Sequence, residues 1–237
     1  MYSMNCRVRY SELNHKTHSL APYGIINYFQ DCSTFQSESL NIGLKTLQEY
    51  NRAWILNSWQ LHILSDIRLG DYITVSTWAH EFKGFFGYRN FLIKDDNDND
   101  LAVANSIWIF MDTETGRPSR IPKDNLGYNI HEAYPMEYLD RKIQLPKGLK
   151  DYSPFPVVDS NIDSYKHVNN AQYVKMAQEF LPDNFRVNQM RVEYSKQARL
   201  GDTILPQVFI NGDLCIVNLA NLNKEPYAII EFKGIYK

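Results

Sequence analysis

The tetrapeptide Arg-Leu-Gly-Asp occurs twice in this chain, at Arg68–Asp71 and at Arg199–Asp202. Each copy lies between stretches rich in strand-forming residues. Aligning the two tetrapeptides also aligns Ile73 with Ile204, an apolar position just beyond each of them. A repeat of this kind constrains the fold strongly, because both halves of the chain must then build the same set of elements.

The match extends in both directions along the chain. Val8 aligns with Val157 and His18 with His167 on the N-terminal side, and Ala102–Ala104 aligns with residues 228–230 on the C-terminal side. The offset between aligned residues decreases toward the C-terminus, which is expected when the first copy has the longer connections. The sequence therefore predicts two copies of one fold.

Each copy has the order strand, helix and then several strands. Residues 1–10 predict a strand, and apolar residues recur at helical spacing from Pro22 and continue through Leu47. A shorter helix is predicted over 170–180, where Pro182 ends it. The predicted strands are 53–66, 71–83, 85–94 and 101–111 in the first copy, and 188–198, 202–210, 214–221 and 226–236 in the second.

One helix for every four or five antiparallel strands indicates α+β layers, with a long helix packed on a curved sheet. That is the hotdog arrangement, here in tandem as a double hotdog. We expect an N-terminal hotdog over 1–125, a linker over 126–152 and a C-terminal hotdog over 153–237. The segment 112–152 is rich in Pro, Gly and charge, and is the expected crossover between the copies.

Composition excludes several classes of function. The 237 residues are 44% apolar, which is enough for a substantial core, and the net charge of −2 argues against a nucleic-acid binder. There is no run of 18 apolar residues, so no membrane span is predicted. The first ten residues resemble neither a signal peptide nor a transit peptide, and we expect a cytoplasmic protein. The sequence does not decide between a monomer and a homodimer.

Metal, nucleotide and disulfide sites find no support. Cys6, Cys32 and Cys215 are widely spaced and are expected to be reduced thiols in or near the core. The acidic run Asp95–Asp100 lacks the Gly and Glu of a calcium loop and predicts a hairpin tip. Gly84–Gly87 has no phosphate-loop spacing, and His15 and His18 have no further ligand candidates nearby.

The most informative motif is residues 163–170, which reads Asp-Ser-Tyr-Lys-His-Val-Asn-Asn and precedes the second predicted helix. A carboxylate and an imidazole four residues apart would stand beside a helix N-terminus, whose amides and positive dipole can stabilise an oxyanion. The same residues could instead form only a capped turn, because Asp and Asn are preferred at turns and N-caps.

The pattern D-x-x-x-H-V-N-N-x-x-Y resembles the catalytic segment of the acyl-acyl-carrier-protein thioesterases. The run Asp112–Pro122 is also similar to that family, where a strand ending in Asp is followed by T-G-R-P and then I-P. The resemblance implies hydrolysis of acyl-acyl-carrier-protein to free fatty acid and carrier thiol, without metal or redox cofactor. The implied partner is acyl carrier protein with its phosphopantetheine-linked acyl chain.

The resemblance assigns roles to five residues. Asp163 would activate water or attack the carbonyl itself, His167 would orient and polarise, and Asn169 would fix the loop or a substrate group. Tyr165 and Gln197 stand where the family usually has Asn and Glu. Gln cannot accept a proton as Glu does, so Gln197 keeps only a hydrogen-bonding role.

The alignment around Gln197 leaves two further points. Ala198 stands where the family often has Cys, so a Cys-His mechanism has no nucleophile here. A shift of the alignment would make Glu193 a rival for the later carboxylate, and Tyr173 is expected to pack or anchor. The first copy keeps His18 without the Asp or the Asn-Asn pair, which predicts a single active site.

Two sets of residues were considered for binding the substrate. Aromatic residues of the first copy supply material for a core or an acyl pocket: Trp54, Trp59, Phe82, Phe85, Phe86, Phe91 and Trp108. Basic residues in the linker could meet an acidic carrier protein: Arg117, Arg120, Lys123, Arg141, Lys142, Lys147 and Lys150.

Three alternatives to this function remain open. An acyl-CoA thioesterase would use the same chemistry on the same fold. A hotdog dehydratase is disfavoured because its H-F-P-G-type segment is absent. A non-catalytic acyl or carrier-protein binder is favoured by Tyr165 and Gln197 at two positions that are usually catalytic.

Overall fold

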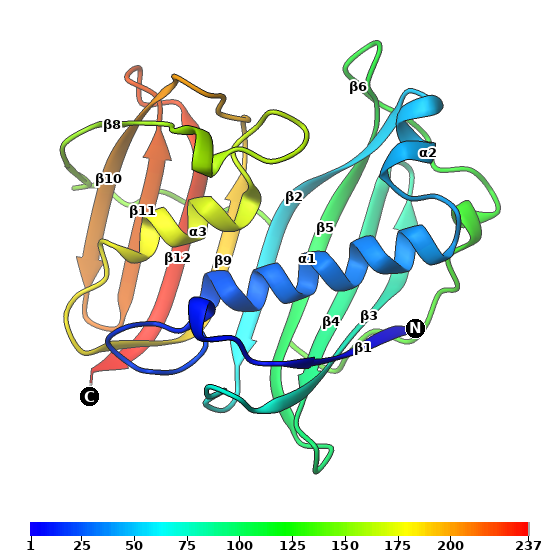
Figure 1. Cartoon of the computed structure of the whole chain (residues 1–237). Coiled ribbons are helices and arrows are strands. Elements are labelled where there is room, and N and C mark those ends of the chain that lie inside the picture. Colours follow the sequence, from blue (N-terminus) through cyan, green and yellow to red (C-terminus); the bar gives the residue numbers. More distant parts are fainter. Residues whose placement is uncertain (237) are drawn as a thin grey trace.

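The computed structural model describes residues 1–236, which form one curved antiparallel sheet with helices on one of its faces (Figure 1). The helices are α1 (Pro22–Ser39), α2 (Leu44–Glu49) and α3 (Asn170–Gln178), with short 3-10 turns η1 (Tyr10–Glu12), η2 (Asn125–Gly127) and η3 (Asp159–Asn161). The strands of the first copy are β1 (Tyr2–Arg7), β2 (Arg52–Ile63), β3 (Tyr72–Lys83), β4 (Phe86–Lys94), β5 (Asp100–Asp112) and β6 (Arg117–Pro118). The others are β7 (Lys150–Asp151), β8 (Phe155–Pro156), β9 (Phe185–Tyr194), β10 (Thr203–Asn211), β11 (Leu214–Ala220) and β12 (Pro226–Tyr236).

The sheet joins two copies of the same strand order. It runs β1-β3-β4-β5-β2-β9-β12-β11-β10-β7, with β8 paired to the end of β10 as β1 is paired to β3. The copies meet where Ser58–His62 of β2 pairs with residues 189–193 of β9. The tandem hotdog predicted from the sequence is therefore confirmed.

The two Arg-Leu-Gly-Asp segments form the same turn. The Asp71 carboxylate accepts the Arg68 amide at 2.7 Å, and the Asp202 carboxylate accepts the Arg199 amide at 2.8 Å. Gly70 and Gly201 have φ of +82° and +86°, the left-handed region that glycine adopts without strain. The tetrapeptide is repeated because both copies need the same turn before β3 and β10.

The turns also bind the chain ahead of each helix in the same way. The Val8 amide donates to the Asp71 carbonyl at 3.0 Å, and the Val157 amide donates to the Asp202 carbonyl at 2.8 Å. The alignment of Val8 with Val157 is thereby confirmed. Two equivalent loops follow, which we call the Asn14 loop (residues 8–21) and the Asp163 loop (residues 157–169).

The core lies between the sheet and the two longer helices. Phe29 of α1 packs against Phe91 of β4 and Trp59 of β2, with ring centroids 4.9 and 6.0 Å apart. The face covered by α1 and α3 is the inner face. Cys32 and Cys215 are buried and Cys6 is half-buried, all as free thiols, as the sequence predicts.

The first helix is shorter than its apolar pattern suggests. The prediction of one helix through Leu47 was wrong, because α1 ends at Ser39 and a separate α2 contains Leu47. Asn41 has φ of +59°, and this left-handed residue turns the chain away from the helix axis. Leu47 then packs with Phe110 and Ile121 in a small cluster of its own.

The linker crosses the outer face of the sheet, opposite the helices. The Trp78 indole donates to the Glu132 carbonyl at 2.9 Å, and the Gln60 amide donates to the Glu137 carbonyl at 2.7 Å. Farther along, Ile143 packs on Ile216 and Ile229 of the second copy. The linker thus covers apolar surface that the sheet would otherwise expose.

Two smaller findings complete the fold. Asp95 caps the tip of the β4–β5 hairpin by accepting the Asn97 and Asn99 amides at 2.9 and 2.8 Å, which confirms the predicted hairpin tip. Within residues 1–236, no helix combines the length and apolarity needed to cross a bilayer.

Candidate functional site

The Asp163 loop is a tight turn closed by the residues that the motif singled out. The Asp163 amide donates to the His167 carbonyl at 2.8 Å, and Asp163 Oδ1 accepts the amides of Tyr165 and His167 at 2.8 and 3.4 Å. The capped turn considered from the sequence is therefore present, and it uses one of the two oxygens of the Asp163 carboxylate. Asp163 Oδ2 forms no hydrogen bond with any described residue, so the same carboxyl group retains an oxygen for chemistry.

The start of α3 offers fewer free amides than the sequence suggested. Asn169 is the N-cap, and its Oδ1 accepts the Ala171 amide at 2.8 Å while its carbonyl accepts the Gln172 amide at 2.9 Å. The Asn170 amide forms no hydrogen bond within residues 1–236. One backbone donor at the positive end of the helix dipole thus remains for a ligand.

A second segment is held against the Asp163 loop by backbone contacts. The Val168 amide donates to the Ala198 carbonyl at 2.9 Å, and the Ala198 amide donates to the Tyr173 hydroxyl of α3 at 2.9 Å. Gln197 precedes Ala198 and is exposed. The structure therefore brings Gln197 next to the Asp163 loop, and Tyr173 anchors the contact as predicted.

Gln197 lies on a loop, although the sequence predicted a strand through Ala198. β9 ends at Tyr194, because the amides of Ser195 and Lys196 both donate to the Tyr227 carbonyl and the regular ladder stops there. The side chain of Gln197 forms no hydrogen bond with another described residue.

Glu193, the rival for the later carboxylate, faces the other way. Its carboxylate accepts Lys142 Nζ at 2.5 Å and the Ile143 amide at 2.9 Å, and both partners belong to the linker on the outer face. Glu193 is only 4% exposed and is fully engaged there. It stabilises the docking of the linker and is not part of the site.

Charge and burial set the state of His167. Partial burial and then the nearby Arg199 guanidinium lower the pKa of His167, and the Asp163 carboxylate offsets part of this shift. The imidazole is therefore neutral near pH 7 and can accept a proton. The sequence did not assign a role to Arg199, although its place in the repeated tetrapeptide put it beside this loop.

Tyr165 lies at the rim of the loop. It is 37% exposed, and its pKa is raised by partial burial and by the carboxylates of Asp163 and Glu38. Its phenol stays protonated and can donate a hydrogen bond.

The first copy has the same loop with different side chains. Asn14 occupies the place of Asp163, since its Oδ1 accepts the amides of Lys16 and Thr17 at 2.8 and 3.2 Å. The Asn14 amide donates to the Ser19 carbonyl at 2.8 Å, so Ser19 and not His18 corresponds to His167. The alignment of His18 with His167 was wrong because the Asn14 loop is one residue longer.

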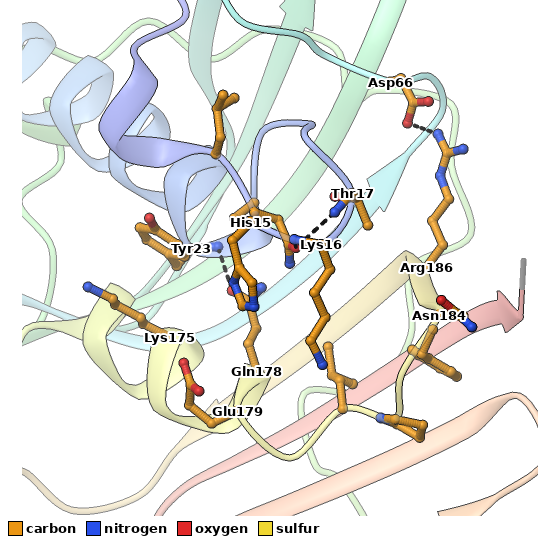
Figure 2. Close-up of a pocket in the computed structure, with 16 residues that line it drawn as sticks. His15, Lys16, Thr17, Tyr23, Asp66, Lys175, Gln178, Glu179, Asn184 and Arg186 are labelled. Atoms are coloured by element: carbon orange, nitrogen blue, oxygen red, sulfur yellow. Dashed lines mark hydrogen bonds and ion pairs between the residues drawn. The ribbon is translucent and has the colours of Figure 1, made fainter.

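A cavity lies at the Asn14 loop of the first copy. It measures about 460 Å³ and is bounded by the Asn14 loop, the end of α3 and the start of β9 (Figure 2). Of the charged groups that line it, Arg186 pairs with Asp66, and Lys16 pairs at 2.7 Å with Asp183, which lies outside the lining. Without a carboxylate at position 14, it has no counterpart of the acid at 163.

Metal chemistry has no ligand set in the described part of the chain. Within residues 1–236, no three His, Cys, Asp or Glu side chains gather closely enough to hold a metal ion.

Models of known families match both halves of the chain. The acyl-ACP thioesterase N-terminal domain matches residues 1–128, and the acyl-ACP thioesterase C-terminal domain matches residues 147–214. The chain belongs to the acyl-ACP thioesterase family. The second match contains Asp163, His167 and Gln197, and the first includes the Thr-Gly-Arg-Pro segment of residues 115–118.

Curated relatives of this family member are plant proteins. A chloroplastic palmitoyl-acyl carrier protein thioesterase of Arabidopsis thaliana is 25% identical over 182 residues, which cover 72% of this chain and 44% of the relative. A chloroplastic acyl-[acyl-carrier-protein] hydrolase of Cuphea viscosissima is 26% identical over 202 residues, covering 78% and 48%. The chain thus spans about half the length of these relatives.

Solved structures match the whole fold. An acyl-ACP thioesterase from Bacteroides thetaiotaomicron superposes with a TM-score of 0.89 at 18% identity, covering 98% of this chain and 96% of the other. A 12:0-ACP thioesterase from Umbellularia californica superposes with a TM-score of 0.87 at 16% identity, covering 100% and 97%. At these identities the likeness establishes the double hotdog fold.

Proposed function

We propose that this protein hydrolyses acyl-acyl-carrier-protein thioesters to free fatty acid and carrier thiol, and that the reaction takes place at the Asp163 loop. Membership of the family supports the reaction. The observation that supports the place is the Val168–Ala198 hydrogen bond of 2.9 Å, which ties the segment carrying Gln197 to the loop that carries Asp163 and His167 ahead of α3. The partner is acyl carrier protein, and the cytoplasmic location expected from the sequence stays a prediction.

The proposed step is the addition of water to the thioester carbonyl. The Asn170 amide donates to the carbonyl oxygen, where negative charge develops, and a preorganised donor of this kind contributes about 3 kcal/mol in other hydrolases. Asp163 Oδ2 or the His167 imidazole accepts a proton from the attacking water. Collapse of the tetrahedral intermediate breaks the C–S bond, and the thiolate of the carrier takes up the proton.

Gln197 and Tyr165 provide hydrogen bonds to this step. The Gln197 side chain can donate and accept at once, so it can orient water without removing a proton from it. The Tyr165 phenol can donate to the pantetheine arm at the rim of the loop. Asn169 acts through the backbone, because it fixes the helix start that carries the Asn170 amide.

A non-catalytic acyl or carrier-protein binder is the second candidate. Two observations favour it. Position 197 holds an amide in place of a carboxylate, and one oxygen of Asp163 is already hydrogen-bonded within the turn. Such a protein would bind acyl-acyl-carrier-protein without turning it over.

The experiment offers the purified protein acyl-acyl-carrier-protein and acyl-CoA of the same chain length, and follows thiol release. The variants are Asp163→Asn, which keeps the turn hydrogen bonds, and His167→Ala, with Ser19→Ala at the equivalent place in the first copy as the matched control. We expect kcat to fall at least about 10²-fold in the first two variants, the effect typical of losing a general base, and to be unchanged in the control.

The outcomes separate the candidates. Faster thiol release from acyl-acyl-carrier-protein supports the proposal. Faster thiol release from acyl-CoA would mean that the protein is an acyl-CoA thioesterase. Binding without release from either substrate establishes the non-catalytic candidate. Full turnover by Asp163→Asn removes Asp163 from its role.

A further inference from the structure

The cavity at the Asn14 loop occupies the place in the first copy that the proposed catalytic site occupies in the second. Two of its lining residues are counterparts of residues at that site. Asn14 closes its loop as Asp163 does, through the same hydrogen bonds to the backbone. Asp66, drawn in Figure 2, and Gln197 each stand two residues ahead of an Arg-Leu-Gly-Asp segment. The cavity of about 460 Å³ lies within the usual size range of ligand pockets.

The same equivalence explains why the cavity lacks the groups that the proposed hydrolysis needs. Leu20 corresponds to Val168, because each donates its amide to the segment ahead of the repeated turn, at 2.7 and 2.9 Å. Pro22, two residues later, therefore stands where the second copy has Asn170. Proline has no N–H, so the donor for the carbonyl oxygen is missing. Ser19 stands where the second copy has its imidazole, so this copy can bind a thioester but lacks the means to hydrolyse it.

The charges that line the cavity cancel one another. The lining contains one complete ion pair, and a second pair joins it to a residue just outside: Arg186 with Asp66, and Lys16 with Asp183 at 2.7 Å. Lys175 and Glu179 also line the cavity, one helical turn apart and of opposite charge, and neither forms an ion pair within residues 1–236. Counting His15 as neutral, the cavity offers no excess charge to a strongly charged ligand.

The rest of the lining mixes uncharged polar and apolar side chains. Three residues of each kind are Thr17, Gln178 and Asn184, and Leu13, Leu181 and Phe185. Such a surface suits a neutral ligand that carries amide groups on an aliphatic chain, because its polar groups find partners and its methylene groups find apolar contacts. A phosphopantetheine arm is a ligand of this kind, since amides and a hydroxyl are its only polar groups between the phosphate and the sulfur.

We propose that this cavity is a second binding site for the phosphopantetheine arm of a thioester, which it holds without hydrolysing it. The inference rests on the proposed function, because the Asp163 loop must receive the same arm and the Asn14 loop repeats its scaffold. Both acyl carrier protein and CoA carry such an arm. α3 begins at the Asp163 loop and its last turn lines the cavity, so the two arms lie at opposite ends of one helix.

The test is isothermal titration calorimetry with an acyl-CoA analogue in which a methylene group separates the sulfur from the carbonyl, so that it has no thioester to hydrolyse. Wild-type protein is expected to bind a second analogue per chain. His15→Trp narrows the cavity from the loop, and Glu179→Trp narrows it from α3. Both residues are exposed, and neither side chain forms a hydrogen bond within residues 1–236. Each variant is expected to weaken the second site at least about 10-fold by overpacking.

Ser11→Trp is the matched control. Ser11 is exposed on η1 ahead of the Asn14 loop and does not line the cavity, so this variant should keep both bound analogues. His15→Trp and Glu179→Trp enter the cavity from opposite sides, and misfolding of one leaves the other as the test. Each should still hydrolyse acyl-acyl-carrier-protein with the wild-type kcat, which shows that the fold and the Asp163 loop are intact.

Failure of this inference and failure of the proposed function give different results. A single analogue per chain in wild-type protein, retained in His15→Trp and Glu179→Trp, overturns the second site and leaves hydrolysis standing. A second analogue that both variants still bind also overturns it, because that analogue must lie elsewhere. If no thioester is hydrolysed, a single analogue that both variants lose still supports the cavity, and no binding at all overturns it.

The source of the arm is decided by a second titration, with the same analogue attached to acyl carrier protein. A second carrier per chain, lost in His15→Trp, supports a cavity that receives carrier-linked arms. A second analogue seen with CoA alone supports a cavity that receives CoA. Carrier protein without its arm is the control, and binding of it that His15→Trp removes would overturn recognition of the arm.

Discussion

The backbone hydrogen bond from Val168 to Ala198, 2.9 Å long, has a counterpart of 2.7 Å from Leu20 to Ile67 in the first copy. In each copy it ties the loop ahead of a helix to the segment that leads into the Arg-Leu-Gly-Asp turn. The scaffold of the site is therefore present twice. Only the Asp163 loop carries an acid and an imidazole at these two equivalent positions, where the Asn14 loop has Asn14 and Ser19.

The Tyr173 hydroxyl is predicted to position Gln197. Tyr173→Phe leaves the buried Ala198 amide without its acceptor, which costs about 1–3 kcal/mol of stability, and it frees the loop that carries Gln197. We expect kcat to fall more than KM rises, as measured with acyl-acyl-carrier-protein. Tyr28→Phe is the matched control, because the Tyr28 hydroxyl bonds to the Arg7 carbonyl in the first copy at 3.2 Å. Equal kcat in the two variants at equal stability would show that Tyr173 acts on the fold alone.

The pH profile is predicted to depend on Arg199. Because the pKa of His167 is lowered, its proton-accepting form predominates at neutral pH, and kcat/KM should rise with pH through a midpoint below about 6.5 and then level off. Arg199→Gln removes a cation that lowers this pKa, so the midpoint should move to higher pH.

Arg68→Gln, at the equivalent place in the first copy, serves as the control for Arg199→Gln. It should leave the midpoint of the profile where it is. A midpoint unaffected by Arg199→Gln would mean that His167 is not the titrating group.

Gln197→Glu is predicted to be tolerated or to raise activity. The position is exposed and lies beside the Asp163 loop, so a carboxylate adds a proton acceptor without burying a charge. The measurement is kcat against Gln197→Ala, which removes the polar group and should lower kcat. Complete loss of activity in Gln197→Glu would contradict the placement of this residue at the site.

Much of the fold could be predicted from the sequence because the repeated residues are the ones that one particular turn requires. Gly70 and Gly201 stand where φ is positive, and the Asp that follows each glycine caps the turn. Most substitutions in the tetrapeptide would therefore destabilise the turn. Helix length was harder to predict. Leu40 and Leu47 keep the apolar period across a break that Asn41 imposes through its left-handed backbone.

The candidate site was predicted in its residues but not in its contacts. The sequence offered the capped turn and the catalytic site as alternatives, and it could not reveal that Asp163 uses one oxygen for the turn while the other has no hydrogen bond to a described residue. The end of β9 at Tyr194 depends on both following amides turning to the Tyr227 carbonyl, which local propensity does not encode. The Asn14 loop also has one residue more than the Asp163 loop, and the sequence repeat did not show this. For that reason His18 was aligned with His167, although Ser19 is its structural equivalent.

Replacing either glycine of the repeated turn is predicted to lower the free energy of unfolding by the same amount. A Cβ at Gly201 would meet no atom within 4 Å, and one at Gly70 would meet only the Arg7 side chain at 3.6 Å, so sterics add little at either place. Alanine at these positive φ values is strained by roughly 1–2 kcal/mol, partly offset by the lower entropy of its unfolded chain. Gly70→Ala and Gly201→Ala should therefore each lower the free energy of unfolding by about 1 kcal/mol in urea denaturation, with the double variant additive. Gly201→Asn should cost less, since Asn tolerates the left-handed region. A much larger loss in one copy would show that the two turns are not equivalent in energy, despite their equivalent hydrogen bonds.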